Sequence, residues 1–437
     1  MNVYDSQRMA DVLAPLGYVS TDSAEAADVI ILNTCHIREK AAEKLYSELG
    51  RYKLSQDQRR AQGSDTLIAV AGCVAQAEGA EIMRRAPYVD IVLGPQTYHR
   101  LPEMIAQVTR ARDVKSNGHN RRGQGVLDIE FPADPKFDFL PDVRVEGPSA
   151  FLSVQEGCDK FCTFCVVPYT RGAEYSRNVN DVLAEARHMV AHGVREITLL
   201  GQNVNGYHGQ TYPGSGGPAG LGELIRRLAD VDGLDLIRYT TSHPADMGAK
   251  LIQAHRDFSE LAPFLHLPVQ SGSNKILRSM NRRHSRDDYL RVIEKLVTAR
   301  PGLKLSSDFI VGFPGESDAD FEATLALVRD VGFIQAFSFI YSPRPGTPGA
   351  LLADRVPGDV QSDRLTTLQA LLTDNQQAFN QSCIGKVMPV LLDRQGRKPG
   401  QLAGKSPYMQ AVHVMAPETH LGEIVDLRIL EALPNSL

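Results

Sequence analysis

Three cysteines lie close together in this 437-residue chain, at Cys158, Cys162 and Cys165. Their spacing places three thiols on one short loop, directly after an apolar run at residues 151–154. Three thiolates on such a loop can bind three irons of a [4Fe-4S] cubane and leave the fourth iron without a protein ligand. A substrate can then bind that iron, so the pattern predicts a reactive cluster.

Structural zinc is the alternative metal for this loop. Zinc normally closes a tetrahedron with a fourth Cys or His, usually through Cys-x-x-Cys pairs. No fourth ligand stands near these three cysteines in the sequence, which favours the cubane. Six cysteines are too few for a disulfide scaffold in a chain of this length, and their uneven spacing favours metal binding in a reducing compartment.

Two further cysteines follow apolar runs near the N-terminus. The runs at residues 29–32, 67–71 and 91–94 are typical of buried parallel strands, and polar helices are expected over 38–60 and 75–86. This alternation predicts a doubly wound parallel α/β domain whose working loops lie at the carboxyl ends of the strands. Cys35 and Cys73 both fall at such ends.

The middle of the chain predicts a second α/β domain. Residues 106–145 lose periodicity and are interpreted as a linker. Strand patterns then recur with helices between them, which predicts a partial (β/α)6 TIM-like barrel. The six expected strands are residues 151–154, 196–200, 236–239, 264–267, 305–311 and 334–340.

The C-terminal part changes character after an amphipathic helix around residues 365–379. Alternating segments at residues 387–392 and 425–430, separated by Gly and Pro turns, predict a small antiparallel β-barrel.

Composition sets outer limits on function. Neither a long apolar run nor a signal-peptide pattern is present, so we expect a cytoplasmic protein without membrane contact. The net charge of -5 provides no global attraction to a phosphate backbone, so RNA must be bound by local basic surface. One such cluster comprises Arg394, Arg397, Lys398 and Lys405.

The spacing of Cys158, Cys162 and Cys165 matches the signature of radical S-adenosylmethionine (SAM) enzymes. Other segments resemble the methylthiotransferase family within that group, and the resemblance covers nearly the whole chain. The matching segments are residues 33–39, 71–73, 167–172, 200–204, 241–244, 267–273 and 312–316. The resemblance implies a methylthiotransferase domain (1–107), a linker (108–143), a radical SAM core (144–376) and an RNA-binding TRAM domain (377–437).

The resemblance also implies how the cofactors act. In the family, SAM chelates the open iron and an electron cleaves the bound SAM. The resulting radical removes the hydrogen on carbon 2 of an adenine, because that hydrogen is too weakly acidic for a side-chain base to remove. Residues at the strand ends are expected to hold SAM, although residues 201–203 taken alone are more typical of a turn. The expected SAM-binding residues are Phe164, Gln202, Asn203, Ser242, Gln270 and Ile310.

Cys35 and Cys73 match family ligands of a second, auxiliary [4Fe-4S] cluster. The third family ligand lies in a Gly-Cys-Gln-Met-Asn motif, and this chain opens with Met1 and Asn2, just after that point. The family's first strand is missing too, which we expect to leave unpaired edges on two neighbouring strands. We therefore hypothesise that translation starts upstream. His36 and Cys383 match no family ligand and are interpreted as a surface residue and a packing residue.

Three functions stay open from the sequence. The first is methylthiolation of N(6)-dimethylallyladenosine in a tRNA anticodon stem-loop. The second is methylthiolation of threonylcarbamoyl-adenosine or of a ribosomal-protein aspartate. The third is RNA binding by a metalloprotein without catalysis. For the enzyme, we expect an electron donor such as a flavodoxin or ferredoxin, and a monomer.

Overall fold

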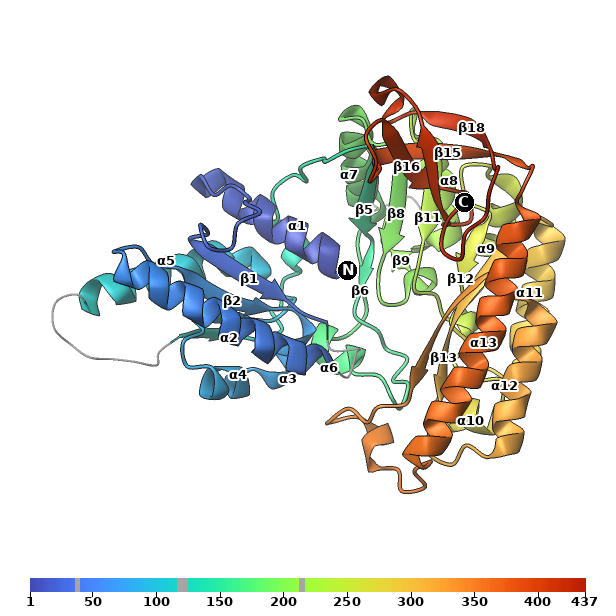
Figure 1. Cartoon of the computed structure of the whole chain (residues 1–437), viewed down its shortest axis with the longest axis horizontal. Helices are drawn as coiled ribbons and strands as arrows, with labels where there is room; N and C mark the ends of the chain where they lie inside the picture. Colours follow the sequence, from blue (N-terminus) through green and yellow to red (C-terminus); the bar gives the residue numbers. More distant parts are fainter. Residues whose placement is uncertain (36–39, 116–124, 212–216) are drawn as a thin grey trace. The chain divides into compact units, whose positions relative to one another are not determined.

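The computed structural model describes the chain except residues 36–39, 116–124 and 212–216, so the prediction for His36 lies outside the described residues. The chain divides into two compact units (Figure 1). The first comprises Met1–Arg144 and Val166–Ala173, and the second Val145–Cys165 and Glu174–Leu437.

The first unit is a parallel sheet with helices on both faces. Its strands follow the order β1-β2-β3-β4 and all pairs are parallel. Alternate residues of β2 pack on opposite faces: Ala69 packs with helices α1 and α5, and Val70 with α2 and α3. This confirms the predicted doubly wound domain. Its main elements are α1 (Asn2–Leu13), β1 (Val29–Asn33), α2 (Lys40–Ala61), β2 (Leu67–Ala71), α3 (Cys73–Glu78), α4 (Ala80–Arg85), β3 (Ile91–Leu93), α5 (Leu101–Lys115), β4 (Val126–Asp128) and α6 (Val167–Arg171).

Two expectations for this unit are corrected. β1 and β2 pair directly, in a register from Val29 opposite Leu67 to Asn33 opposite Ala71, so these edges are not left unpaired. The range 108–143 is not simply a linker, because α5 continues to Lys115 and β4 pairs with β3. An unpaired edge leaves backbone N–H and C=O groups without partners, and both pairings satisfy them.

The second unit contains the predicted partial barrel. Its strands form two parallel sheets, β11-β8-β5 and β12-β13-β14, and a parallel bridge from Ile237 to Leu261 connects β11 to the segment before β12. All six predicted strands are confirmed. The barrel elements are β5 (Ser149–Ser153), α7 (Val179–Ala191), β8 (Glu196–Leu200), α8 (Leu221–Ala229), β11 (Leu236–Tyr239), α9 (Ala249–Asp257), β12 (Phe264–His266), α10 (Asn274–Ser279), α11 (Arg286–Ala299), β13 (Lys304–Val311), α12 (Asp318–Val331) and β14 (Gln335–Ile340). The short strands beside them are β6 (Gln155–Glu156), β7 (Tyr175–Ser176), β9 (His208–Gly209) and β10 (Ala219–Gly220).

A long helix, α13 (Gly358–Ser382), leads from the barrel to a curled antiparallel sheet in the order β17-β16-β15-β18. The strands are β15 (Val387–Gln395), β16 (Gln401–Lys405), β17 (Ala411–Met415) and β18 (Ile424–Arg428). Cys383 is fully buried among Val390, Leu392 and their neighbours, which confirms its packing role.

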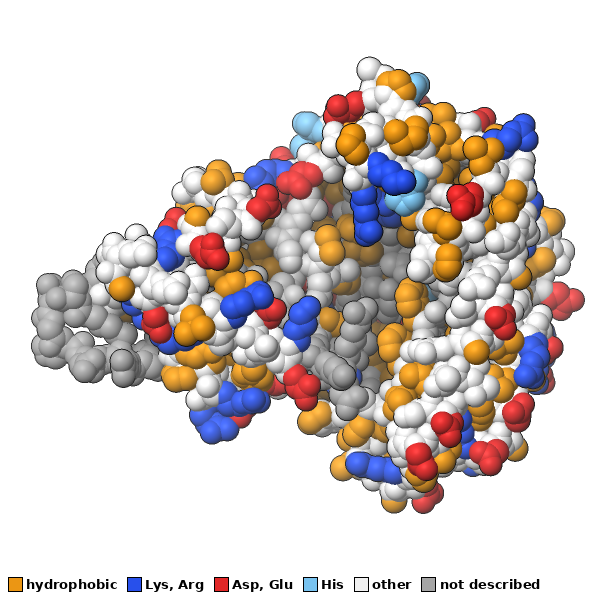
Figure 2. Space-filling model, viewed as in Figure 1, with side chains coloured by type: hydrophobic (Ala, Val, Ile, Leu, Met, Phe, Trp, Pro, Cys, Tyr) orange, Lys and Arg blue, Asp and Glu red, His pale blue; other side chains and the backbone are white. Residues whose placement is uncertain are grey.

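None of the described helices is long and apolar enough to cross a bilayer. Acidic and basic side chains are interspersed over the face drawn in Figure 2, as the nearly balanced composition leads one to expect.

Candidate functional site

The three-cysteine loop begins after β6, at the carboxyl ends of the barrel strands. Cys162 is buried, whereas Cys158 and Cys165 are half-buried. The Cys165 N–H donates to the Cys162 carbonyl at 3.0 Å, which closes a tight turn between these two residues. Phe161, just before Cys162, adopts a left-handed φ of 48°. The loop is therefore compact and shaped by its own backbone.

Two glutamines fasten the start of this loop to the end of β8. The Gly157 N–H donates to Gln202 Oε1 at 2.6 Å, and Gln155 Oε1 accepts the N–H groups of Gln202 (2.8 Å) and Asn203 (3.0 Å). A Cβ at Gly201 would lie 2.5 Å from Gln155 Oε1, so only glycine allows this approach. The predicted SAM ligand Gln202 thus also positions the cysteine loop.

The middle of the loop is fastened to the segment after α10. The Thr163 N–H donates to the Met280 carbonyl at 3.1 Å, and Asn281 Nδ2 donates to the Phe161 carbonyl at 3.0 Å. From the other side, the Gly349 N–H donates to the Thr163 carbonyl at 2.7 Å. Anchors on several elements hold the three thiols in one arrangement.

A buried cation stands beside the thiols. Arg282 is 5% exposed, and its Nη1 donates to Cys162 Sγ at 3.5 Å while Nη2 donates to the Pro268 carbonyl at 2.5 Å. Burial, together with the nearby Cys162, raises the pKa of the Cys158 thiol to about 11. Ionised thiolates here therefore need positive charge, which Arg282 supplies and which irons would supply when bound.

Buried polar atoms at the strand ends provide a test of whether SAM fits. Among the described residues, Asn203 Oδ1, Ser242 Oγ and the Tyr341 hydroxyl are buried and have no hydrogen-bond partner. Asn203 Nδ2 donates to Asp246, which also pairs with Lys160 of the cysteine loop. Leaving such atoms unpaired is costly, so they are suited to bind a polar ligand. The predicted residues Asn203 and Ser242 fit SAM in this respect.

An apolar wall completes this region. Phe164 and Ile310 both pack against the cluster of Met280, Phe313 and Tyr341. The structure thus brings together two predicted SAM residues that are far apart in the sequence.

Backbone strain is concentrated around the same loop. Of the six described non-glycine residues with positive φ, five lie in the cysteine loop or just after strands and helices near it: Phe161, Thr241, Gln270, Asn281 and Arg283. The Gln270 N–H donates to Asp308 and its carbonyl accepts the Ile310 N–H, which holds the predicted SAM residue Gln270 at φ 80°. Such strain persists where the surroundings enforce it, commonly at functional sites.

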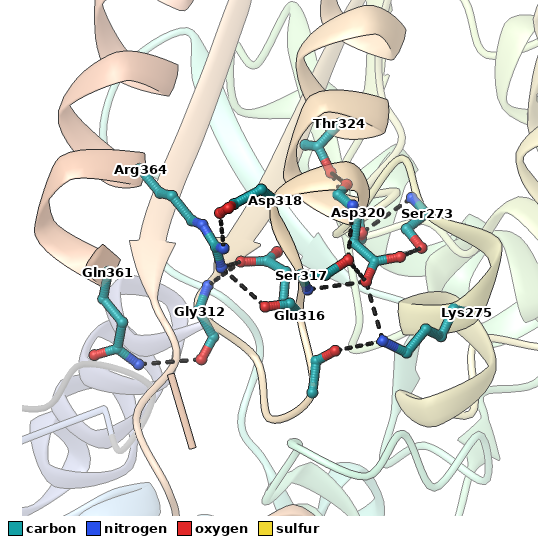
Figure 3. A network of polar contacts seen from close by, with 12 residues as sticks. Ser273, Lys275, Gly312, Glu316, Ser317, Asp318, Asp320, Thr324, Gln361 and Arg364 are labelled. Carbon is teal, nitrogen blue, oxygen red and sulfur yellow. Dashed lines mark hydrogen bonds and ion pairs between the residues drawn. The ribbon is translucent and has the colours of Figure 1, made fainter. Parts of the chain in front are cut away.

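A polar network supports the loop after β13 (Figure 3). Glu316 is buried and accepts the Gly312 N–H at 2.7 Å and Arg364 Nη1 of α13 at 2.9 Å. Asp320 accepts from the Ser273 hydroxyl at 2.6 Å and from Lys275 at 3.2 Å. This network connects the end of the Ile310 strand to α12 and α13.

In the first unit, backbone hydrogen bonds join the loops that carry Cys35 and Cys73. The Thr34 N–H donates to the Ala71 carbonyl at 3.0 Å, and the Val74 N–H donates to the Thr34 carbonyl at 3.2 Å. Gly72 has φ 89°, and a Cβ there would lie 2.4 Å from Asn33 Oδ1. Sequence and structure agree in placing the two cysteines at neighbouring strand ends.

A buried ion pair in this unit was not predicted. Arg171 Nη2 lies 2.6 Å from Asp5 Oδ2, and both side chains are 2% exposed. Burial raises the pKa of Asp5, but Arg171 and Lys136 beside it hold that pKa below its usual range. The sequence indicated only that Arg171 lies in residues 167–172, one of the segments that resemble the family.

Within the described residues, no group of three or more His, Cys, Asp or Glu side chains is gathered around one point as a single metal ion requires. In a cubane each thiolate binds a different iron, so its ligands need not share one ion. The sequence also missed Arg282 and Tyr341. The sequence signal for Arg282 was its place beside other basic residues, Arg278 and Arg283, which indicates positive charge but not which group it meets.

Family models match three parts of the chain. Residues 1–94 match uncharacterized protein family UPF0004, residues 152–328 the radical SAM superfamily, and residues 381–437 the TRAM domain. A curated relative, tRNA-2-methylthio-N(6)-dimethylallyladenosine synthase of Maricaulis maris (strain MCS10), is 59% identical over 442 residues, covering all of this chain and 94% of the relative.

Solved structures show the same fold at low identity. The radical SAM methyltransferase TsrM from Kitasatospora setae, with tryptophan and a SAM analogue bound, matches with a TM-score of 0.56 and 14% identity over 80% of this chain and 72% of TsrM. The cobalamin-dependent radical SAM enzyme OxsB matches with a TM-score of 0.51 and 12% identity over 85% of this chain and 53% of OxsB.

Proposed function

This chain belongs to the methylthiotransferase family of radical SAM enzymes, and from that premise we propose that it converts N(6)-dimethylallyladenosine beside a tRNA anticodon to its 2-methylthio derivative. The observation that supports this best is the anchored loop of Cys158, Cys162 and Cys165 beside buried Arg282. The substrate is carried over from the 59% identical relative.

The side chains divide the work of holding the cofactors. Cys158, Cys162 and Cys165 would hold three irons, and Arg282 stabilises the Cys162 thiolate through its hydrogen bond. When bound, the cluster and SAM supply homolytic hydrogen abstraction, which carbon 2 of adenine requires. Asn203 Oδ1 and Ser242 Oγ offer hydrogen bonds to SAM.

The apolar wall excludes water from the site. Phe164, Ile310 and Phe313 cover one side of the site with carbon, which keeps water from a reactive centre.

We propose further that Cys35 and Cys73 bind an auxiliary cluster as a source of sulfur. In the domain division that we propose, the N-terminal domain extends through β4 and the radical SAM core spans residues 144–376. The TRAM domain spans residues 377–437 and contacts tRNA. A flavodoxin or ferredoxin serves as the electron donor to a cytoplasmic monomer.

Anaerobic reconstitution tests the chemistry. Reduced protein with SAM is expected to release 5'-deoxyadenosine, and Cys162→Ala to abolish that release. Cys383→Ala, which changes a core cysteine outside the site, serves as the control. Zinc in place of iron and sulfide in oxygen-free preparations would contradict the proposal.

Substrate choice is tested separately. The reduced enzyme is incubated with tRNA carrying dimethylallyladenosine, tRNA carrying threonylcarbamoyl-adenosine, or a ribosomal-protein substrate, and the products are analysed by mass spectrometry. A methylthio product only in the first reaction supports the proposal. A methylthio product only in the second or third reaction identifies the other family activity. If no reaction yields 5'-deoxyadenosine, the remaining hypothesis is an RNA-binding metalloprotein without catalysis.

A further inference from the structure

Strand β14, the last strand of the barrel, carries two exposed aromatic rings. Phe337 is 48% exposed and Phe339 is 40% exposed, although both belong to a regular strand. On the adjacent strand β13, by contrast, Phe309 is fully buried against Phe333, with ring centroids 5.5 Å apart. Rings of this size are usually buried, so two exposed ones close together on a strand indicate a binding surface.

The pairing of β13 with β14 shows which face these rings occupy. The strands are parallel, and Asp308 lies opposite Phe337. Two residues further on, Ile310 lies opposite Phe339. Paired residues of neighbouring strands point to the same face of a sheet, so both rings share a face with Ile310. Ile310 and Phe164 of the cysteine loop pack against the same buried cluster, so this face continues toward the expected SAM site.

The rings lie within reach of a base at that site. Phe337 precedes Phe339 by two residues, which corresponds to about 7 Å along the strand. The reacting carbon 2 and the N6 group belong to the same adenine, so N6 must lie within the width of one base from the SAM site. The face around Phe337 and Phe339 meets this condition.

A carboxylate stands beside the rings. The Asp308 side chain is 29% exposed, and His266 Nε2 lies 3.5 Å from its Oδ1. His266 Nδ1 lies 2.8 Å from the Ser306 hydroxyl, and the His266 ring meets Phe337 edge to face with centroids 6.2 Å apart. Among the residues that the structure describes, no lysine or arginine pairs with Asp308. The face therefore combines apolar rings with a hydrogen-bond acceptor of negative charge.

We propose that this face selects the substituent on N6 of the substrate adenosine. Phe337 and Phe339 pack against the dimethylallyl group, and Asp308 accepts the hydrogen bond of the N6–H. Threonylcarbamoyl-adenosine carries a carboxylate, which Asp308 repels and which would lose its hydration against the rings. The inference rests on the proposed function and deepens it, because it names the side chains that distinguish the two modified adenosines.

Binding of two anticodon stem-loops tests the rings. One carries N(6)-dimethylallyladenosine and the other unmodified adenosine, and fluorescence anisotropy gives the Kd of each for anaerobically reconstituted protein with SAM. Because only the first RNA buries an apolar group, we expect wild-type protein to bind it about tenfold or more tightly. Phe337→Ala/Phe339→Ala should bring the ratio of the two Kd values close to 1. Phe337→Leu/Phe339→Leu should retain most of the preference, because leucine is also apolar.

The ratio is the readout because general damage to the protein weakens both complexes alike. The matched control is Val297→Ala, which shortens an exposed apolar side chain of α11 and should keep the wild-type ratio. An unchanged ratio in folded Phe337→Ala/Phe339→Ala would overturn the inference, as would a wild-type protein without preference. Thermal unfolding verifies the fold. If the double variant does not fold, the two single variants are measured, and an unchanged ratio in both overturns the inference.

A third stem-loop, which carries threonylcarbamoyl-adenosine, tests the carboxylate. We expect Asp308→Asn to bind this RNA about tenfold more tightly than wild-type protein does, because the repulsion between like charges is removed. Asp287→Asn makes the same charge change at an exposed position of α11 and should have no such effect. Equal affinities of Asp308→Asn and wild-type protein would overturn the role of Asp308. If wild-type protein forms no methylthio product with any of the three RNAs, the proposed function fails, which is a distinct result because the Kd ratio requires no turnover.

Discussion

Arg282 places a buried positive charge 3.5 Å from the Cys162 sulfur. Hydrogen bonds to cluster sulfurs set the reduction potential, because they stabilise the more negative, reduced state. We expect Arg282→Met to shift the potential of the reconstituted cluster downward, on the order of tens of millivolts. An EPR-monitored redox titration measures the shift. Arg283→Met, which changes the exposed neighbour, provides the control, and an equal shift in both variants would contradict a role for this hydrogen bond.

His255 makes the second unit sensitive to acid. It is 1% exposed, its Nε2 lies 2.6 Å from the Tyr239 hydroxyl, and burial lowers its pKa to about 3. Below pH 6.5 the unfolded chain therefore binds a proton that the folded chain does not, and the free energy of unfolding falls by about 1.4 kcal/mol per pH unit from this residue. Urea unfolding between pH 7 and 5 is expected to show a smaller pH dependence in His255→Gln. Exposed His192→Gln should retain the wild-type slope.

At the scale of elements, α13 supports the loop after β13 through a buried ion pair. Arg364 Nη1 lies 2.9 Å from Glu316 Oε2 (Figure 3). The Glu316 side chain is 1% exposed and the Arg364 side chain 7%. Arg364→Met would leave a buried carboxylate without its cation, which typically costs about 3–5 kcal/mol. We expect the double variant Glu316→Gln/Arg364→Met to be more stable than Arg364→Met. Urea unfolding of these two variants, of Glu316→Gln and of the wild type completes the double-mutant cycle, and additive effects would show that the pair is not coupled.

Helix α11 begins with a capping box. The Ser285 hydroxyl accepts the Asp288 N–H, and the Asp288 side chain accepts the Ser285 N–H. Ser285→Ala is expected to lower the free energy of unfolding by about 1 kcal/mol. Exposed Ser362, inside α13, bonds only a carbonyl of its own helix, so Ser362→Ala should have little effect. Equal losses in thermal or urea unfolding would argue against the cap as the cause.

At the scale of the whole molecule, each compact unit has a core of its own. Ile68 and Val92 are fully buried in the first unit, and Leu265 and Phe309 in the second. Because each core can melt as a unit, we expect two transitions in calorimetry of the full chain. Ile68→Ala should lower only one transition and Leu265→Ala only the other, each by about 2–5 kcal/mol. A single transition that both variants shift equally would contradict this division.

The sequence by itself determined the local features. Apolar periodicity located the six barrel strands, and the spacing of Cys158, Cys162 and Cys165 determined that three thiols share a loop. Both are properties of adjacent residues, so they can be recognised without knowing the fold.

Only the tertiary structure decided which distant groups meet. Arg282 reaches Cys162 across 120 residues, and Arg364 reaches Glu316 across 48. The same holds for the pairing of β1 with β2, and for β4, which lies in a range interpreted as linker. These contacts form because charges and strand edges that become buried must be paired when the chain compacts. The sequence shows which residues need a partner, but it does not show which residue that partner is.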